Sequence, residues 1–461
     1  MILVKYARKY EIFEKIIFFR QKIAFMKYLF TFLTFIFCVL MCTFIFAQND
    51  SVPKNKNQKK ILGGQIIKIS DTLWYRIYNP VQGYFQKANF DKSDPRFMIA
   101  NEDQSFKFGI GGSVKLVAFA DFAGTVPDYD FVTSLIPIPT DNYGQFDLFA
   151  NYSRLNVKVV GRIKGNPIVA FIEGSFTGNN NAFKMRHAYV SFLGFTVGQT
   201  WSTFMDLQAS PATIDGEGPG NQIALRHPMI RYTYYYKKKL QVAFAVEMSQ
   251  LLMDEEAVRP FQIYQQRQRI PDFIAHVKYE GKFGHVQLGA LLGMINYGDS
   301  AQHKKSLYIP GGGVSLSGTF HLWKDATLYY QGDGGKGMAS YIQDLSIFGY
   351  ELLPAFTGNK KVNTVWMYGG YVGLQQYWTK KLHSNIVYGI TRLETPKGDH
   401  DLYEKHVPWY YKQGQYLAVN TFWNFYGFAT AGLELVWGEK RNLNNDKGHA
   451  HRINLFLQYD F

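Results

Sequence analysis

The chain is nearly free of cysteine. Its two cysteines, Cys38 and Cys42, both lie within an apolar run at residues 28–46 that follows several basic residues and precedes a small one. This is the layout of a secretory signal peptide. We expect a signal peptide over residues 1–47, with the true start at Met26. The mature chain would then have no thiol, which excludes disulfides, cysteine catalysis and Cys-ligated metal sites.

Long apolar runs are also missing beyond residue 47. No stretch there approaches the roughly 18 residues that a membrane helix needs, yet aromatic residues make up 17% of the chain, with 32 Tyr and 38 Phe. Many aromatic residues without spanning helices are typical of a membrane barrel, in which they form girdles at both interfaces. A soluble all-β protein is the alternative that composition leaves open.

Alternation of apolar and polar residues is the main secondary-structure signal. Residues 106–122 and 154–162 show it most clearly, with apolar side chains at every second position and cations such as Lys115 and Lys158 between them. In a membrane barrel each strand turns apolar side chains to lipid and polar side chains to the water-filled lumen. The pattern predicts an all-β fold, a transmembrane antiparallel β-barrel over residues 106–461.

Sixteen segments carry strand signals. They are 106–122, 149–162, 167–178, 183–193, 194–203, 226–236, 239–250, 272–281, 284–297, 309–321, 325–334, 363–378, 381–393, 414–425, 427–438 and 449–461. Short turns such as Lys164-Gly165-Asn166-Pro167 alternate with longer polar stretches, as periplasmic turns alternate with outer loops in such barrels. A barrel of this size encloses an aqueous channel.

The two flanks of the barrel differ in character. The last strand alternates up to a terminal Phe461, which is the signal expected for folding by the barrel-assembly machinery and so predicts that partner and an outer-membrane location. Residues 48–105 have no clear period. We interpret them as a periplasmic N-terminal segment that contains a short ordered piece.

Several motifs resemble one family of membrane barrels. They are VGQTWSTFMD at 197–206, RHP at 226–228, IRYT at 230–233, GHVQL at 284–288 and GLE at 432–434. Together they resemble the DcaP-like family of trimeric outer-membrane porins over about residues 106 to 461. The resemblance implies a sixteen-stranded barrel, three barrels per assembly, and a lumen that favours small anions such as dicarboxylates. Family members can carry a heptad-patterned periplasmic helix, but residues 48–105 show no sustained heptad, so coiled-coil trimerisation is not carried over.

The predicted polar faces place seven cations in the lumen. They are Lys115, Arg154, Lys158, Arg162, Lys184, Arg186 and Arg231. Cations that line a narrow pore favour anions, and Arg can make transient bidentate contacts with a carboxylate. The alternative is that these are ordinary solvated residues paired with acids such as Glu173.

One connection is too long and too rich in Gly and Pro for a hairpin turn, at residues 199–225. We expect it to fold inward as a constriction loop or outward as a trimer contact. Folded inward, it would place Asp206, Asp215 and Glu217 opposite the basic wall, and the resulting transverse field would orient dipolar solutes. A plain surface loop is the alternative.

Signals for catalysis are weak. Gly332–Gly337 has the glycine spacing of a nucleotide-binding turn, but no suitable helix follows, so we interpret it as a flexible loop. His449 and His451 lack a third ligand at a recognisable spacing. We expect no enzyme activity, cofactor, metal or nucleic-acid partner. The leading hypothesis is a passive porin in outer-membrane lipid, and the alternatives are an adhesin or structural anchor and, third, an outer-membrane hydrolase.

Overall fold

The computed structural model describes residues 64–68, 74–78, 95, 97–101, 105–237, 239–301, 304–356, 361–396 and 400–461. The expected signal peptide over residues 1–47 lies outside the described residues. Among the described residues, no helix combines the length and the apolar character needed to cross a membrane.

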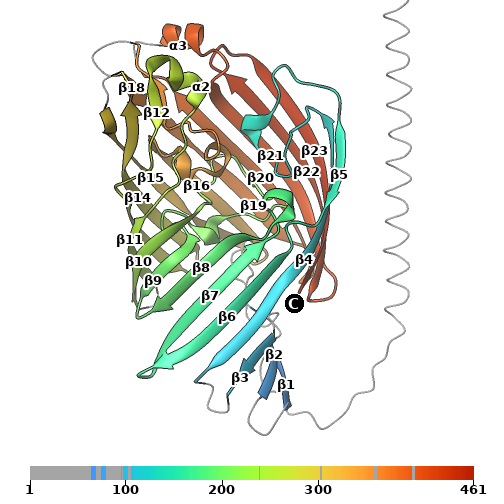
Figure 1. Cartoon of the computed structure of the whole chain (residues 1–461). Helices are drawn as coiled ribbons and strands as arrows, with labels where there is room; N and C mark the ends of the chain where they lie inside the picture. Colours follow the sequence, from blue (N-terminus) through green and yellow to red (C-terminus); the bar gives the residue numbers. More distant parts are fainter. Residues whose placement is uncertain are drawn as a thin grey trace, which may run out of the picture. The chain divides into compact units, whose positions relative to one another are not determined.

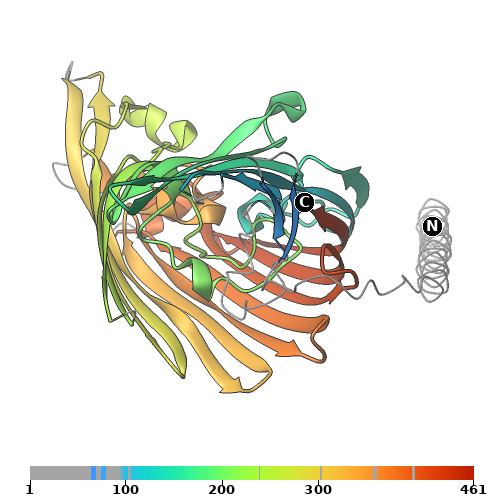
Figure 2. The same cartoon turned by 90° about the horizontal axis from the view of Figure 1, so that it is seen from below.

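Sixteen of the described strands pair antiparallel in sequence order and form a closed barrel (Figures 1 and 2). They are β4 (Lys107–Ala123), β6 (Arg154–Ile163), β7 (Asn166–Ser175), β8 (Lys184–Phe192), β9 (Phe195–Trp201), β10 (Arg226–Tyr236), β11 (Leu240–Glu247), β13 (Asp272–Gly281), β14 (Gly284–Asp299), β15 (Lys304–Trp323), β16 (Ala326–Lys336), β19 (Trp366–Tyr377), β20 (Leu382–Glu394), β21 (Tyr411–Asn424), β22 (Ala429–Asn442) and β23 (Lys447–Asp460). The predicted sixteen-stranded all-β barrel is confirmed. β16 continues to Lys336, so the interpretation of Gly332–Gly337 as a flexible loop was wrong for all but its last residue.

Shorter elements attach to this barrel. β1 (Gly64–Lys68), β2 (Trp74–Tyr78) and β3 (Phe97–Ala100) form a meander that continues onto the first half of β4, where Phe97 pairs with Ile110. The remaining elements are β5 (Gln145–Phe149), β12 (Ile263–Gln265), β17 (Leu352–Pro354), β18 (Val362–Thr364), α2 (Glu255–Val258), α3 (His400–His406), η1 (Thr133–Leu135), η2 (Asn179–Asn181), η3 (Leu207–Ala209), η4 (Arg259–Phe261), η5 (Ala339–Tyr341) and η6 (Gln343–Leu345). The described residues of the segment 48–105 thus include three strands, and the periplasmic location of this segment stays a prediction.

The two faces of the barrel wall have opposite chemistry. On the outer face Val114 is 57% exposed and Phe273 is 55% exposed, whereas Asp121 and His276 are buried on the inner face. This is the alternation that the sequence predicts, because successive side chains of a strand point to opposite faces of the sheet. Apolar side chains therefore form the outer belt, and polar ones fill the interior.

The two ends of the barrel also differ. Short turns join the strands at one end, here called the turn end, and long connections join them at the other, called the loop end (Figure 1). In the turn between β6 and β7, Lys164 has φ +49° and Gly165 has φ +80°. Positive φ at both central residues gives the tight hairpin turn whose twist suits antiparallel strands.

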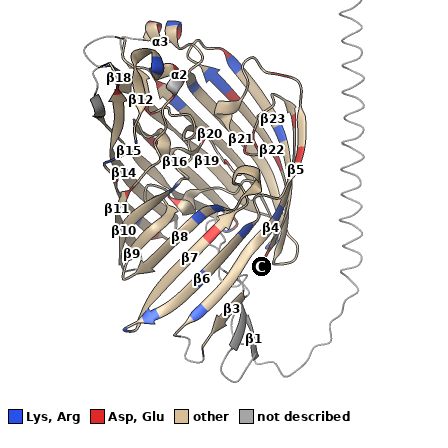
Figure 3. Cartoon of the chain, in the orientation of Figure 1, with Lys and Arg blue, Asp and Glu red and all other residues tan. Residues whose placement is uncertain are grey.

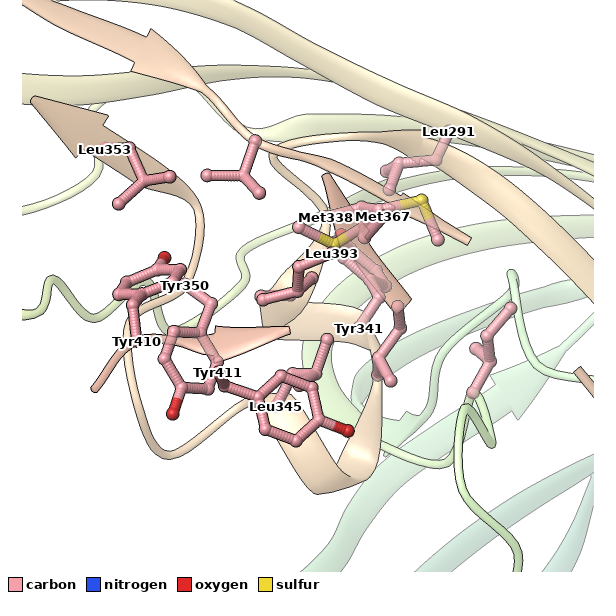
Figure 4. Packing of buried hydrophobic residues seen from close by; sticks show 14 of the residues in the cluster. Leu291, Met338, Tyr341, Leu345, Tyr350, Leu353, Met367, Leu393, Tyr410 and Tyr411 are labelled. Carbon is pink, nitrogen blue, oxygen red and sulfur yellow. The ribbon is translucent and has the colours of Figure 1, made fainter. Parts of the chain in front are cut away.

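Long connections fold into the barrel and pack there on one another (Figure 2). A buried apolar cluster joins Tyr341 and Leu345 of the β16–β19 connection to Tyr410 of the β20–β21 connection, and it rests on Leu291 and Met367 of the wall (Figure 4). Because Leu291 lies on β14 and Met367 on β19, this cluster fills the lumen on the β14–β20 side. Open space is therefore left toward β4–β9.

Candidate functional site: a basic wall facing an inward loop

A cavity of about 840 Å³ lies inside the barrel next to the first strands. Its wall comes mainly from β4, β6, β7, β8 and β21 to β23, and its other side comes from the long connections that precede β6, β10 and β19. The charged residues that line it are Lys115, Asp128, Asp130, Arg154, Glu173, Lys184, Arg186, Asp215, Glu217, Arg226 and Asp460. The lining is thus rich in both basic and acidic side chains.

The connection between β9 and β10, residues 202–225, is called the constriction loop below. Its first part is anchored by Asp206, whose carboxylate lies 3.1 Å from Lys278 Nζ, 2.7 Å from His285 Nε2 and 2.9 Å from Ser317 Oγ. These three partners lie on β13, β14 and β15. The chain thus leaves β9 and reaches across the lumen to a wall several strands away.

Its second anchor is Glu434 on β22, which is fully buried. The Glu434 carboxylate accepts hydrogen bonds from the backbone N–H groups of Ile214 (2.9 Å) and Asp215 (2.8 Å). Asn420 and Asn454 donate to the same carboxylate at 2.8 and 3.1 Å. Of the two expected positions, the loop therefore takes the inward one, held at both ends of its path by buried carboxylates.

The basic side of the cavity is organised around one buried acid. Glu173 on β7 is 1% exposed, and its Oε1 lies 3.0 Å from Arg186 Nε and 3.9 Å from Arg154 Nη1. Lys115 reaches from β4 to the constriction loop, with its Nζ 3.4 Å from the backbone oxygen of Ile214. Figure 3 shows basic residues in blue on β4, β6 and β8.

Six of the ten predicted site residues meet in this cavity. They are Lys115, Arg154, Lys184, Arg186, Asp215 and Glu217. Lys158 and Arg162 have the same strand parity as Arg154 but lie progressively nearer the turn end of β6, outside the cavity lining. Arg231 lies midway along β10, also outside the cavity lining, and donates from Nη1 to the backbone oxygen of Trp201 at 3.4 Å.

Asp206 lies outside the cavity lining, contrary to the expectation that it faces the basic wall. It is 3% exposed and bound to the opposite wall, where it anchors the loop. The sequence pattern could not distinguish Asp206 from Asp215, because both residues lie in the same stretch, which shows no alternation of apolar and polar residues. Its role in this structure is to hold the loop in place.

Sequence reasoning missed three residues of the site. Arg226 packs its guanidinium 3.5 Å from the centroid of the Trp201 ring, but its parity on β10 is opposite to that of Arg231, so alternation pointed it outward. Asp130 lies in a connection without any period and accepts a hydrogen bond from Tyr152 Oη. Glu434 was visible as part of the GLE motif, but its contact with the loop depends on tertiary structure.

The net charge of the cavity depends on which of its groups are ionised, because the lining has five basic and six acidic side chains. Burial raises the pKa of Asp130, and repulsion from Asp215 raises it further. Burial likewise raises the pKa of Asp215, with repulsion from Glu434 as the second cause, and burial holds the pKa of Glu217 well above its usual range. The loop acids therefore carry less than their formal negative charge near neutral pH.

No group of three or more His, Cys, Asp or Glu residues within the described part of the chain is arranged to hold a metal ion. Among the charged groups of the cavity, Arg154 and Arg186 instead pair with Glu173, and Lys115 donates to the loop. Such an arrangement can attract, orient and pass on a charged solute without binding it tightly.

Comparisons with known proteins agree with the barrel fold. Residues 61–283 match the model of a family described as the DcaP outer membrane protein. The structure is similar to the crystal structure of the outer membrane channel DcaP of Acinetobacter baumannii, with a TM-score of 0.66, 18% sequence identity, and coverage of 77% of this chain and 98% of that one. It is also similar to Salmonella typhi OmpF in complex with daunomycin, with a TM-score of 0.50, 10% identity, and coverage of 77% and 98%. A search of curated proteins found no match.

Proposed function

Because the chain belongs to the DcaP outer membrane protein family, we propose that it forms a passive channel that prefers small anionic solutes such as dicarboxylates. An outer-membrane channel is the function that the family and the barrel share. The preference for anions is our extension. It rests on one observation, the set of basic side chains on β4, β6 and β8 that faces loop acids whose negative charge is weakened by burial.

The basic residues would act as a ladder along the wall. Lys184 is exposed at the loop end of β8, and Arg186 and Arg154 lie beside the buried Glu173. Below them, Lys158 and Arg162 continue on the same face of β6 at intervals of four residues, or about 13 Å along a strand. A carboxylate could then exchange one bidentate Arg contact for the next, because each contact is strong enough to attract it and exposed enough to release it.

The assembly and its partners belong to the same proposal. We propose a homotrimer, as the resemblance to the family implies, embedded in outer-membrane lipid and folded with the help of the barrel-assembly machinery through the strand that ends at Phe461. The chain would act without a cofactor and without enzymatic turnover. Arg231, on the lumen side of β10, would contribute positive charge outside the cavity lining.

A barrel that serves as an adhesin or structural anchor is the second candidate. The observation in its favour is that the apolar cluster and three long connections fill the lumen on the β14–β20 side. Such a barrel would be closed to ions if the remaining cavity did not connect the two ends. A hydrolase is the third candidate, and it would require turnover of lipid or peptide by the purified protein.

Conductance of the purified protein in planar bilayers tests the proposal. We expect stepwise ohmic currents, with reversal potentials in a KCl gradient that favour chloride. Currents that favour potassium would remove the anion preference but keep the channel. A silent bilayer would support the anchor, and release of fatty acids from the bilayer lipid would support the hydrolase.

A further inference from the structure

We infer that the turn end of the barrel binds the headgroups of anionic phospholipids along one sector of its rim. The sector consists of the four short turns between β10 and β20 and is called the basic rim below. Its turn residues are Lys237–Lys239, Lys282–Phe283, Lys324–Asp325 and Trp378–Lys381. This inference does not depend on what passes through the channel.

The four turns form one continuous strip. The N–H of Glu280 donates to the backbone oxygen of Lys239 at 2.8 Å, which ties the first turn to the second. The N–H of His321 donates to the oxygen of Phe283 at 2.7 Å, and the N–H of Tyr377 donates to the oxygen of Asp325 at 2.8 Å. Each turn is therefore one hairpin from the next, about 10 Å apart.

Basic residues dominate this strip. Its turn residues include seven lysines, and Asp325 is the single acid among them. Lys239, Lys282 and Lys324 are exposed, and within the part of the chain that the structure describes they form no ion pair. The strip is bounded by uncharged turns on both sides, Leu193-Gly194 between β8 and β9 and residues 425–428 between β21 and β22. The turns that border the strip thus carry no charge, and beyond them the turn between β6 and β7 carries Lys164.

Every turn of the strip also presents an aromatic ring next to its lysine. Tyr236 is 49% exposed, Phe283 37%, Trp323 57% and Trp378 63%, and the ammonium group of Lys237 lies 5.1 Å from the centroid of the Tyr236 ring. Aromatic rings settle at the boundary between acyl chains and headgroups, and lysine side chains extend from that depth to the phosphates. This combination fits a phospholipid, which offers an apolar chain and an anionic head at adjacent depths.

A cell-wall polymer fits the strip less well. It would supply negative charge but no apolar contact for the four rings, and these turns are too short to reach away from the membrane surface. Short turns face the periplasm in outer-membrane barrels, so the lipid concerned would be a glycerophospholipid of the inner leaflet. Clustered lysines recognise such lipids by the charge of the headgroup.

Quenching of tryptophan fluorescence tests this inference, because Trp323 and Trp378 lie on the basic rim. The full-length protein would be reconstituted in phosphatidylcholine vesicles that contain either brominated phosphatidylglycerol or brominated phosphatidylcholine. The W323F/W378F variant gives the background of the other tryptophans. We expect phosphatidylglycerol to associate about fivefold more strongly than phosphatidylcholine, which is roughly what one lysine near an anionic headgroup supplies.

The variant K237Q/K238Q/K239Q/K282Q/K324Q/K380Q/K381Q, which removes all seven lysines of the strip, should lose this preference, so that both brominated lipids quench equally. A control variant at the loop end, K405Q/K412Q/K440Q/K447Q, should keep it. High salt should abolish the preference of the unmodified protein, since the charges involved are exposed. Heat-modifiable mobility on gels checks that each variant remains a folded barrel.

Equal quenching by the two lipids in the unmodified protein would overturn the inference. So would a preference for phosphatidylglycerol that survives in the turn variant, because the lysines would then not be its source. Binding of purified peptidoglycan that is lost in the turn variant, with unchanged lipid preference, would assign the basic rim to the cell wall instead.

Discussion

Arg452 and Asp121 join the last strand of the barrel to the first. Arg452 Nε lies 2.6 Å from Asp121 Oδ1, Arg452 Nη2 lies 3.0 Å from Asp121 Oδ2, and both side chains are fully buried. The two residues are directly paired between β23 and β4, next to a break in register. Arg452 also donates to the backbone oxygens of Val126, Asp128 and Tyr129, so one guanidinium fixes both the seam and the connection that follows β4.

Replacement of Arg452 with Gln should destabilise the barrel strongly. The variant leaves Asp121 buried without its cation, and loss of one partner of a buried pair costs about 3–5 kcal/mol. Urea unfolding in detergent micelles, followed by tryptophan fluorescence, would measure the loss. Lys447→Gln, an exposed change on the same strand, is the control. Equal midpoints for R452Q and the unmodified protein would show that the seam does not depend on this pair.

The anion preference should depend on the arginines that line the cavity more than on those below it. Each charge within about 4 Å of a passing ion contributes about 1 kcal/mol even in water. The variant R154Q/R186Q should therefore lower the ratio of chloride to potassium permeability by at least about fivefold. Reversal potentials in a KCl gradient would measure this ratio.

The matched variant K158Q/R162Q removes the same number of charges from the turn-end half of β6. It should lower the permeability ratio by a smaller factor, because those side chains lie outside the cavity lining. A larger effect of K158Q/R162Q would place the selective region nearer the turn end. An unchanged ratio in the combined variant R154Q/K158Q/R162Q would show that the basic face of β6 is not involved.

The strands could be predicted closely because lipid and water act on every residue of a membrane strand. Residues 226–236 and 272–281 were predicted with the bounds that β10 and β13 have. β15 begins at Lys304 rather than at the predicted residue 309. This strand runs past the apolar belt, where no lipid enforces alternation. Gly332–Lys336 looked flexible because of its glycines, but those glycines let β16 pack closely on Met338 and Tyr368.

The site could be predicted only in part, because alternation shows on which face of the strand a side chain lies but not at which level along the barrel axis. Lys115 and Arg154 were assigned to the lumen and do line the cavity, whereas Lys158 and Arg162 share that face at another level. The course of the constriction loop depends on Glu434, which lies more than 200 residues away in the sequence. No local pattern encodes a contact of that kind.

The anion preference should strengthen as the pH falls. Burial and neighbouring acids raise the pKa of Asp130 to about 7 and that of Asp215 to about 6. A carboxyl with a raised pKa is charged above that value and neutral below it, so acidification from about pH 8 to about pH 5 removes negative charge from the cavity. Reversal potentials across this range should shift toward anions, with most of the change between the two pKa values.

The variant D130N/D215N should flatten this pH dependence and fix the preference near its acidic value. Asp147→Asn, an exposed change on β5 outside the cavity lining, should leave the profile as it is. A pH profile that stays unchanged in D130N/D215N would assign the titration to other groups.

Loss of the Glu434 carboxylate should release the constriction loop. Glu434→Ala removes the acceptor for the backbone N–H groups of Ile214 and Asp215, and each hydrogen bond to a charged group contributes about 1.5–3 kcal/mol. We expect a larger and noisier single-channel conductance, because the loop would no longer be held across the lumen. Glu439→Gln, on the opposite face of the same strand, should conduct like the unmodified protein. If E434A also conducts like the unmodified protein, the anchor at Asp206 is sufficient to hold the loop.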